Sequence, residues 1–294
     1  MEDLTEICAP GVTCEDRMVG VAVGVTLRVL TFSPPADIGN PSVLFVAGWI
    51  SQITAWQTVL KEMTKDFRVV YVETREKISS RVHGSAEYSV TAIGNDLVNL
   101  VEQLDFPPER YVIFGSSLGA TAIVDCYPAL MRKPLALILV SPNAEFRVPR
   151  IWLFVVTLFY PPLYALIRPT VKWYLKNFRL DVRTDQEQYL KYSKALDAAD
   201  PWKLKKALLS VSNYEIWDRL DFLNSPTLLV GASKDVLHEP ENLRKMASNI
   251  RNALTIDLET NKKTHSEHVV QEMRAFLARI SAGSDIAGQR IQGQ

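Results

Sequence analysis

Residues 111–120 read YVIFGSSLGA, and the rest of the chain is interpreted from this stretch. The apolar run at 111–114 is typical of a buried parallel strand. A G-x-S-x-G pattern follows at 115–119, and residues 120–127 then predict a helix. A strand, a glycine-flanked serine and a helix are the context in which a serine is held exposed on a tight turn. We therefore expect a nucleophile at this turn.

Ser117 is the predicted nucleophile because glycines lie two positions away on both sides, at Gly115 and Gly119. A tight turn crowds these two positions, so hydrogen is the side chain that fits. Ser116 would need glycines where Phe114 and Leu118 stand. An ordinary glycine-rich turn in an α/β domain could carry the same pattern. The choice between this turn and a nucleophile turn depends on features in the rest of the chain.

Composition excludes one class of partner. The chain has 294 residues, 47% of them hydrophobic and 22% charged, which is typical of a globular protein with one large core and a modest insertion. Lys plus Arg equals Asp plus Glu, at 33 each, and no basic stripe is present. We therefore expect no nucleic-acid partner. The oligomeric state cannot be predicted from the sequence.

The cysteines bear on compartment and metal content. Cys8, Cys14 and Cys126 are odd in number and lack metal-ligand spacing, and the first residues, MEDLTE, lack an apolar signal region. These features predict a reducing, cytoplasmic location, with membrane association left open by a segment described below. We expect neither a metal nor a cofactor.

Predicted strands and helices alternate on both sides of the glycine-flanked serine. Such alternation favours an α/β fold with a mostly parallel, doubly wound sheet. Residues 1–17 show little periodicity and are expected to pack late or not at all. Strands are expected at 18–23 and 26–32 (an edge hairpin), 42–47, 67–73, 111–114, 135–140, 226–231 and 253–258, and helices at 54–63, 89–104, 120–127 and 269–280.

This alternation stops between residues 141 and 224, where no clear strand is predicted. The expected organisation is a core from 1–144 and 223–282, a helical cap or lid at 145–222 and a disordered tail at 283–294. The cap contains a seventeen-residue run without charge, at 151–167, bracketed by arginines and a lysine. Pro161 and Pro162 divide it into pieces too short to span a membrane. It is expected to roof an apolar pocket or to rest in a membrane interface, with buried cap core or a subunit interface as further alternatives.

A serine, an aspartate and a histidine follow one another along the chain in an order that is typical of one known fold. Ser117 is followed by Asp235, at the end of PTLLVGASKD, and then by His265, before a terminal helix. This order resembles the α/β-hydrolase fold, over about residues 18–280. The resemblance implies a Ser-His-Asp triad and a helical cap after the strand that follows the nucleophile turn. It identifies a superfamily and no particular substrate.

The same resemblance implies an oxyanion hole made by backbone N–H groups. The expected donors are those of Leu118, which follows the nucleophile, and Trp49, in the loop after the strand at 42–47. Many members of the superfamily carry His-Gly in this loop, whereas this chain carries Ala47-Gly48. Trp49 could instead be a core aromatic beside a glycine turn.

His265 is preferred as the base over the other three histidines. His83 precedes the nucleophile, and His238 follows Asp235 within the same loop. His268, one helical turn after His265, is the serious rival. We prefer His265 because a histidine in a loop can reach over the edge of the sheet.

The expected function is a serine hydrolase that cleaves an ester or thioester with an apolar acyl part. A serine hydroxyl needs a base to become nucleophilic, and imidazole can serve near neutral pH. The resemblance implies hydrolysis, and the apolar cap suggests the apolar substrate. Acyl transfer to an alcohol or amine is the first alternative, and a non-catalytic binding member of the fold is the second.

Overall fold

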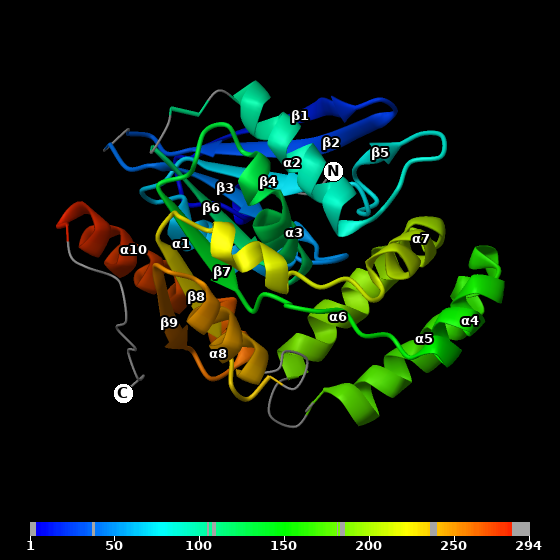
Figure 1. The fold of residues 1–294 in the computed structure, drawn as a ribbon. Helices are drawn as coiled ribbons and strands as arrows, with labels where there is room; N and C mark the ends of the chain where they lie inside the picture. Colours follow the sequence, from blue (N-terminus) through cyan, green and yellow to red (C-terminus); the bar gives the residue numbers. More distant parts are fainter. Residues whose placement is uncertain are drawn as a thin grey trace.

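The computed structural model describes residues 4–36, 39–104, 106–107, 110–180, 182, 186–235 and 240–283. The expected disordered tail, apart from its first residue Gly283, and His238 lie outside these residues. Nine strands within the described part form one sheet in the order β1-β2-β4-β3-β6-β7-β8-β9, with β5 paired to β2 (Figure 1). They are β1 (Thr13–Ala22), β2 (Val25–Ser33), β3 (Ser42–Val46), β4 (Val69–Glu73), β5 (Arg81–Val82), β6 (Tyr111–Ser116), β7 (Ala136–Val140), β8 (Thr227–Gly231) and β9 (Ala253–Asp257).

The sheet is mostly parallel, as the sequence predicts. All pairings from β4 through β3, β6, β7 and β8 to β9 are parallel, whereas β1, β2 and β5 pair antiparallel. The apolar runs become central strands because both of their faces are covered: every residue of β4, β6, β7 and β8 is buried. The six expected core strands agree with the structure to within two residues.

The amino-terminal segment corrects one expectation. Strand β1 begins at Thr13, and Ile7, Cys8 and Ala9 are buried in the core. The Ala9 N–H donates to Thr64 Oγ1 at 2.9 Å, so this segment is anchored. The hydrophobic periodicity did not predict the first half of β1, because six of its first seven residues are exposed on an edge strand. Such a strand has no alternation of apolar and polar residues to detect.

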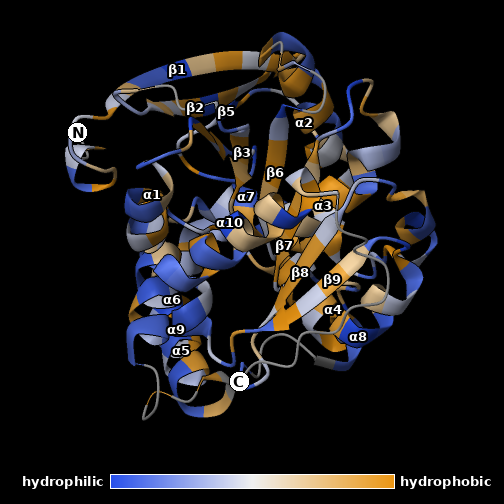
Figure 2. Cartoon of the chain, turned by 90° about the vertical axis from the view of Figure 1, so that its left-hand side faces the viewer, coloured by the Kyte–Doolittle hydropathy of each residue, from blue (hydrophilic) through white to orange (hydrophobic). Residues whose placement is uncertain are grey.

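Helices cover both faces of the sheet and bury alternate residues of each strand. In β6, Tyr111 and Ile113 pack into one core cluster, while Val112 and Phe114 pack into the other. The first cluster includes residues of α2 (Val90–Leu104), α3 (Leu118–Cys126) and α8 (Pro240–Asn249). The second includes residues of α1 (Gln57–Met63) and α10 (Glu267–Ser281). Figure 2 shows the hydrophobic strands in the interior and the more hydrophilic helix α6 outside them.

Helices also fill the insertion between β7 and β8. They are α4 (Arg150–Leu158), η4 (Pro161–Leu163), α5 (Tyr164–Tyr174), η5 (Leu175–Arg179), α6 (Gln186–Ala198), α7 (Pro201–Val211) and η6 (Trp217–Phe222). The break in the apolar run falls at the two prolines, as expected. Helix α4 contacts α7 and α5 contacts α6, so α4 and α5 form an outer layer (Figure 1). Within the described residues of this insertion, β-pairing is limited to a single bridge between Glu145 and Glu215.

The turn between β6 and α3 is held by backbone contacts that exclude side chains. A Cβ on Gly119 would lie 2.4 Å from the Val46 carbonyl oxygen, and one on Gly115 would lie 2.9 Å from the Ala120 Cα. Both distances are shorter than real Cβ contacts. The end of β3 is thereby pressed against the first turn of α3, and the glycines of the motif are required by packing.

Replacing Gly119 with alanine should therefore destabilise the protein. Backbone atoms cannot yield as a flexible side chain would, and overpacking typically costs about 1–3 kcal/mol in free energy of unfolding. Gly20→Ala is the matched control, because nothing lies within 4 Å of a Cβ there, and it should change stability by less than about 0.5 kcal/mol. Urea unfolding of both variants measures this, and equal stabilities would contradict the packing argument.

Candidate active site

Ser117 stands at the turn between β6 and α3 in a strained conformation. Its φ is 48° and its ψ is −121°, a combination that a side-chain-bearing residue rarely adopts and that costs about 1–3 kcal/mol. Its side chain is half-buried. Such strain is typical of functional sites, where the surrounding structure enforces it.

Asn143 is a site residue that sequence reasoning missed. Its side-chain Nδ2 donates to Ser117 Oγ at 3.0 Å, and Thr121 Oγ1 donates to the Asn143 carbonyl oxygen at 2.8 Å. Asn143 follows β7, whose last residue pairs with Ser116 of β6. The only sequence signal was its position after a neighbouring parallel strand, since such positions gather at one edge of the sheet.

Asp235 follows β8 and is buried, at 5% exposure. Its carboxylate accepts hydrogen bonds from Asn261 Nδ2 at 3.1 Å and from Gln188 Nε2 at 3.3 Å. Gln188 belongs to α6 of the insertion and is itself buried. Burial first, and then the nearby charge of Asp235, raise the pKa of the Tyr192 phenol in the same helix. The insertion therefore contributes part of the surroundings of the acid.

His265 lies at the end of α9 (Asn261–Thr264), the short helix after β9. Its ring stacks on Trp56 with the centroids 4.1 Å apart. Its Nδ1 lies 3.0 Å from the Asn261 carbonyl oxygen. A carbonyl can only accept, so this contact favours the tautomer with the proton on Nδ1 and a basic lone pair on Nε2.

Asn261 links the two residues. Its side-chain amide donates to Asp235, and its backbone carbonyl faces the ring of His265. Asp235 and His265 are thus placed around one buried asparagine. Sequence reasoning missed Asn261 because an asparagine in a loop after a strand carries no distinguishing pattern.

The other described histidines lie in different surroundings. The backbone N–H of His83 donates a hydrogen bond to the Gly24 carbonyl oxygen in the edge hairpin. His268 is exposed in the first turn of α10, and its Nδ1 lies 2.9 Å from Ser266 Oγ. The choice of His265 as the base stays a prediction.

The loop after β3 approaches the nucleophile through a glycine. A Cβ on Gly48 would lie 3.2 Å from the Ser117 Cβ, so Trp49, the next residue, is close to the same serine. The Trp49 indole nitrogen is buried and has no hydrogen-bond partner among the described residues. Leu118 is the first residue of α3, where backbone N–H groups have no partner within the helix.

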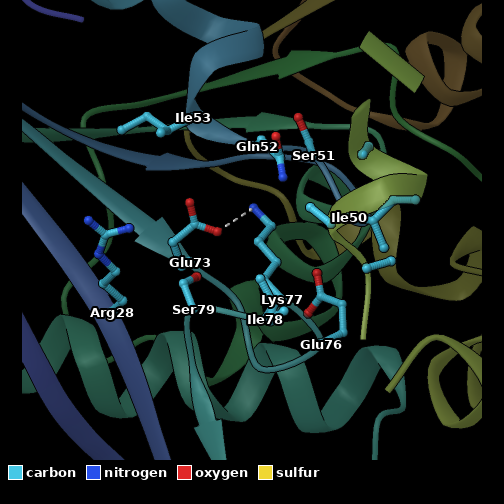
Figure 3. Close-up of a pocket in the computed structure, with 13 residues that line it drawn as sticks. Arg28, Ile50, Ser51, Gln52, Ile53, Glu73, Glu76, Lys77, Ile78 and Ser79 are labelled. Carbon is cyan, nitrogen blue, oxygen red and sulfur yellow. Dashed lines mark ion pairs between the residues drawn. The ribbon is translucent and has the colours of Figure 1, made fainter. Parts of the chain in front are cut away.

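A cavity of about 320 Å³ opens beside this loop. Figure 3 shows its walls, which come from the loop after β3, the end of β4 with the following loop, and Arg28 of β2. Ala195 and Ala198 of α6 and the following Ala199 close the remaining side. No residue of the 151–167 run lines this cavity. Among the residues described, no three His, Cys, Asp or Glu side chains are arranged to hold a metal ion.

Comparisons with known proteins connect this geometry to a fold. No family model matches the chain, and no curated protein matches it in sequence. A hydrolase from Pseudomonas aeruginosa superimposes with a TM-score of 0.72 at 16% identity, covering 93% of this chain and 99% of that one. An esterase from Thermogutta terrifontis gives 0.71 at 21% identity, covering 90% and 99%. A membrane phospholipase A gives 0.67 at 15% identity, covering 91% and 87%.

These similarities extend over nearly the whole length of both chains in each pair. At such low identity they establish the architecture and leave the reaction to be argued from the site. The sheet order, the strained serine after β6 and the placement of an acid and a histidine after later strands agree with that architecture. The chain has the α/β-hydrolase fold.

Proposed function

We propose that this protein is a serine hydrolase that cleaves an ester or thioester with an apolar acyl part, using Ser117, His265 and Asp235. The observation that carries the proposal is the strained Ser117, held between Gly48 and the start of α3. The position of His265, with Nδ1 on a carbonyl and its ring on Trp56, supports its role as the base.

The reaction would proceed in two halves. His265 Nε2 takes the proton of Ser117 Oγ as this oxygen attacks the substrate carbonyl, and the N–H groups of Trp49 and Leu118 stabilise the oxyanion. The protonated imidazole then gives its proton to the departing alcohol or thiol, which leaves an acyl-enzyme. Water attacks the acyl-enzyme with the same base, releasing the acid and restoring Ser117. Asp235 stabilises the imidazolium, while Asn261 orients that carboxylate.

Acyl transfer is the alternative that shares every step except the last. An alcohol or amine would then replace water at the acyl-enzyme. A binding protein without catalysis would have no need for the strain stored at Ser117, so it is the weaker alternative.

Ser117→Ala should abolish ester hydrolysis and labelling by a fluorophosphonate. Loss of a triad member typically lowers kcat by about 10⁴-fold or more. The neighbouring variant Ser116→Ala is the matched control and should retain most of both activities. Turnover of any ester at an unchanged rate by Ser117→Ala would disprove the mechanism.

His265→Ala should be as damaging as Ser117→Ala, and the double variant should be little worse, because triad members act as a unit. His268→Ala should keep most of the activity, since that ring is exposed and bound to Ser266. Steady-state kinetics on one soluble ester compares the three single variants and the double variant with the unaltered protein. An exchange of the two histidine phenotypes would assign the base to His268.

We also propose that the outer layer of α4 and α5 docks on a membrane surface. Helix α4 contains no buried residue. Exposed large apolar side chains continue through the layer: Ile151, Trp152, Phe154, Val155, Leu158, Tyr160, Leu163, Leu166, Ile167, Trp173, Tyr174 and Phe178. Patches of this extent mark interaction surfaces. Because these side chains are exposed, docking is favoured over a roof that would bury them above a pocket.

Charge and shape indicate a lipid interface as the occupant. Residues 146–180 contain six Arg or Lys and no Asp or Glu. Arg147, Arg168 and Lys172 pair with Glu145 or Asp197 outside this range, and the remaining excess of positive charge suits anionic lipid headgroups. Within the described chain no single helix is long and apolar enough to cross a membrane. Helix α4 and the segment Pro161–Phe178 meet that criterion only as a pair bent by 102°. A bent apolar pair with basic flanks is suited to lying in an interface. We therefore propose that the protein is cytoplasmic and associates with a membrane surface.

Leu158→Asp should weaken binding to vesicles that contain an anionic lipid. Burial of a leucine side chain contributes about 1.5–3 kcal/mol, so the partition coefficient should fall by about tenfold or more. Added salt should weaken binding of the unaltered protein as well. Val23→Asp, at the fully exposed tip of the edge hairpin, is the control and should bind normally. Co-sedimentation measures both variants, and absence of binding by the unaltered protein would reject docking.

A further inference from the structure

Two buried charged side chains in the cavity of Figure 3 have polar atoms without hydrogen-bond partners. Lys77 is 5% exposed and Glu76 is 3% exposed. Among the described residues, no hydrogen bond reaches Lys77 Nζ or Glu76 Oε2. The nearest charge to the ammonium is Glu73 Oε2, at 3.7 Å, beyond hydrogen-bond distance. The other oxygen of Glu76 accepts from Thr74 Oγ1 at 2.6 Å, which holds the carboxylate in place.

An unmade hydrogen bond at a buried charge is unfavourable, so these atoms indicate a site that something polar completes. The ammonium can only donate and the carboxylate can only accept. A hydroxyl group matches both, since its oxygen accepts from Lys77 while its hydrogen is donated to Glu76. A polyol provides such groups in sequence.

The charges in the cavity wall favour a neutral occupant. Its charged side chains are Arg28, Glu73, Glu76 and Lys77, two of each sign. The Arg28 guanidinium already donates to Asp16. An anionic or cationic ligand would add a buried charge that nothing in the wall balances, and that is costly. A hydroxyl adds none.

The place of the cavity assigns the hydroxyls to one end of the substrate. Ile50 and Ser51, which follow Trp49 in the loop after β3, form part of its wall. Ser51 Oγ accepts from Trp56 Nε1 at 3.0 Å, and the same Trp56 ring stacks on His265. The wall is thus connected to the groups proposed to act on the ester. Its volume of about 320 Å³ lies at the lower end of small-molecule sites, about 300–1,000 Å³.

We infer that this cavity binds the free hydroxyls of a polyol leaving group, so that the substrate is a polyol monoester. This inference rests on the proposed ester hydrolysis and specifies the alcohol part of the substrate. Lys77 donates to a hydroxyl oxygen and Glu76 accepts the hydroxyl hydrogen, while the acyl part lies elsewhere.

Two esters that differ only in hydroxyl groups test the inference. Glycerol monobutyrate and propyl butyrate share the acyl part and the three-carbon alcohol chain. The ratio of their kcat/KM values should favour the glycerol ester by about tenfold, which corresponds to about 1.4 kcal/mol. Lys77→Met and Glu76→Gln should each bring the ratio close to one. The second variant preserves shape and the contact with Thr74, which guards against misfolding.

Exposed residues of the same types provide matched controls. Lys61 and Glu102 are exposed residues of α1 and α2. Lys61→Met and Glu102→Gln should both keep the kcat/KM ratio that the unaltered protein shows for the two esters. A ratio near one in the unaltered protein would mean that only water fills the cavity, and would overturn the inference. A ratio unchanged in both cavity variants would overturn it as well.

Failure of ester hydrolysis itself is separated by a binding measurement. Saturation-transfer NMR with glycerol as the probe requires no turnover. A signal from the unaltered protein that is lost in Lys77→Met and Glu76→Gln would support the polyol site even if neither ester were cleaved. No signal, or a signal that persists in both variants, would overturn it.

Discussion

The structure depends on the close approach of two backbones, at the end of β3 and the start of α3. Gly119 faces the Val46 carbonyl, and Gly48 faces the Cβ of Ser117. A Cβ on Gly119 would overlap the Val46 carbonyl oxygen at 2.4 Å, and one on Gly48 would be in tight contact with the Ser117 Cβ at 3.2 Å. The same approach holds Ser117 at a positive φ and brings the loop after β3 beside it. The stability of the central sheet therefore sustains the strain at the serine, and this is how a packed core can keep a reactive group in an unfavourable conformation.

The insertion between β7 and β8 is joined to this framework through polar contacts as well as packing. Gln188 of α6 donates to Asp235. Lys203 of α7 donates to the carbonyl oxygens of Lys77 and Ser80, at 2.6 Å each. The α4–α5 layer is attached to α6 and α7 in turn, for example by Tyr164 OH, which donates to the Leu196 carbonyl. The insertion thus contacts the proposed acid and the cavity, and it also carries the exposed apolar layer, so the position of each depends on the others.

Much of the fold could be predicted from the sequence because central strands are apolar on both faces and their ends carry turn residues. The start of the edge strand β1 was not predicted, since most of its side chains are exposed. In the site, Ser117 was recognisable from its glycines. Asn143, Asn261 and Gln188 were not, because single amide side chains become informative only when folding brings them to Ser117 and Asp235. The cavity was equally hidden: Glu76 and Lys77 resemble any charged loop until their burial is known.

The chemistry around the site points to a substrate with two unlike ends. An apolar acyl chain is the part suited to the proposed docking on lipid, because such chains partition into the bilayer and are scarce in water. The cavity beside the loop after β3 is instead lined by balanced charges, with a free donor on Lys77 and a free acceptor on Glu76. An ester whose apolar end lies in the membrane and whose hydroxyls lie in the protein would satisfy both surfaces at once. The scissile bond would then lie between the two ends, at the half-buried Ser117 that follows β6.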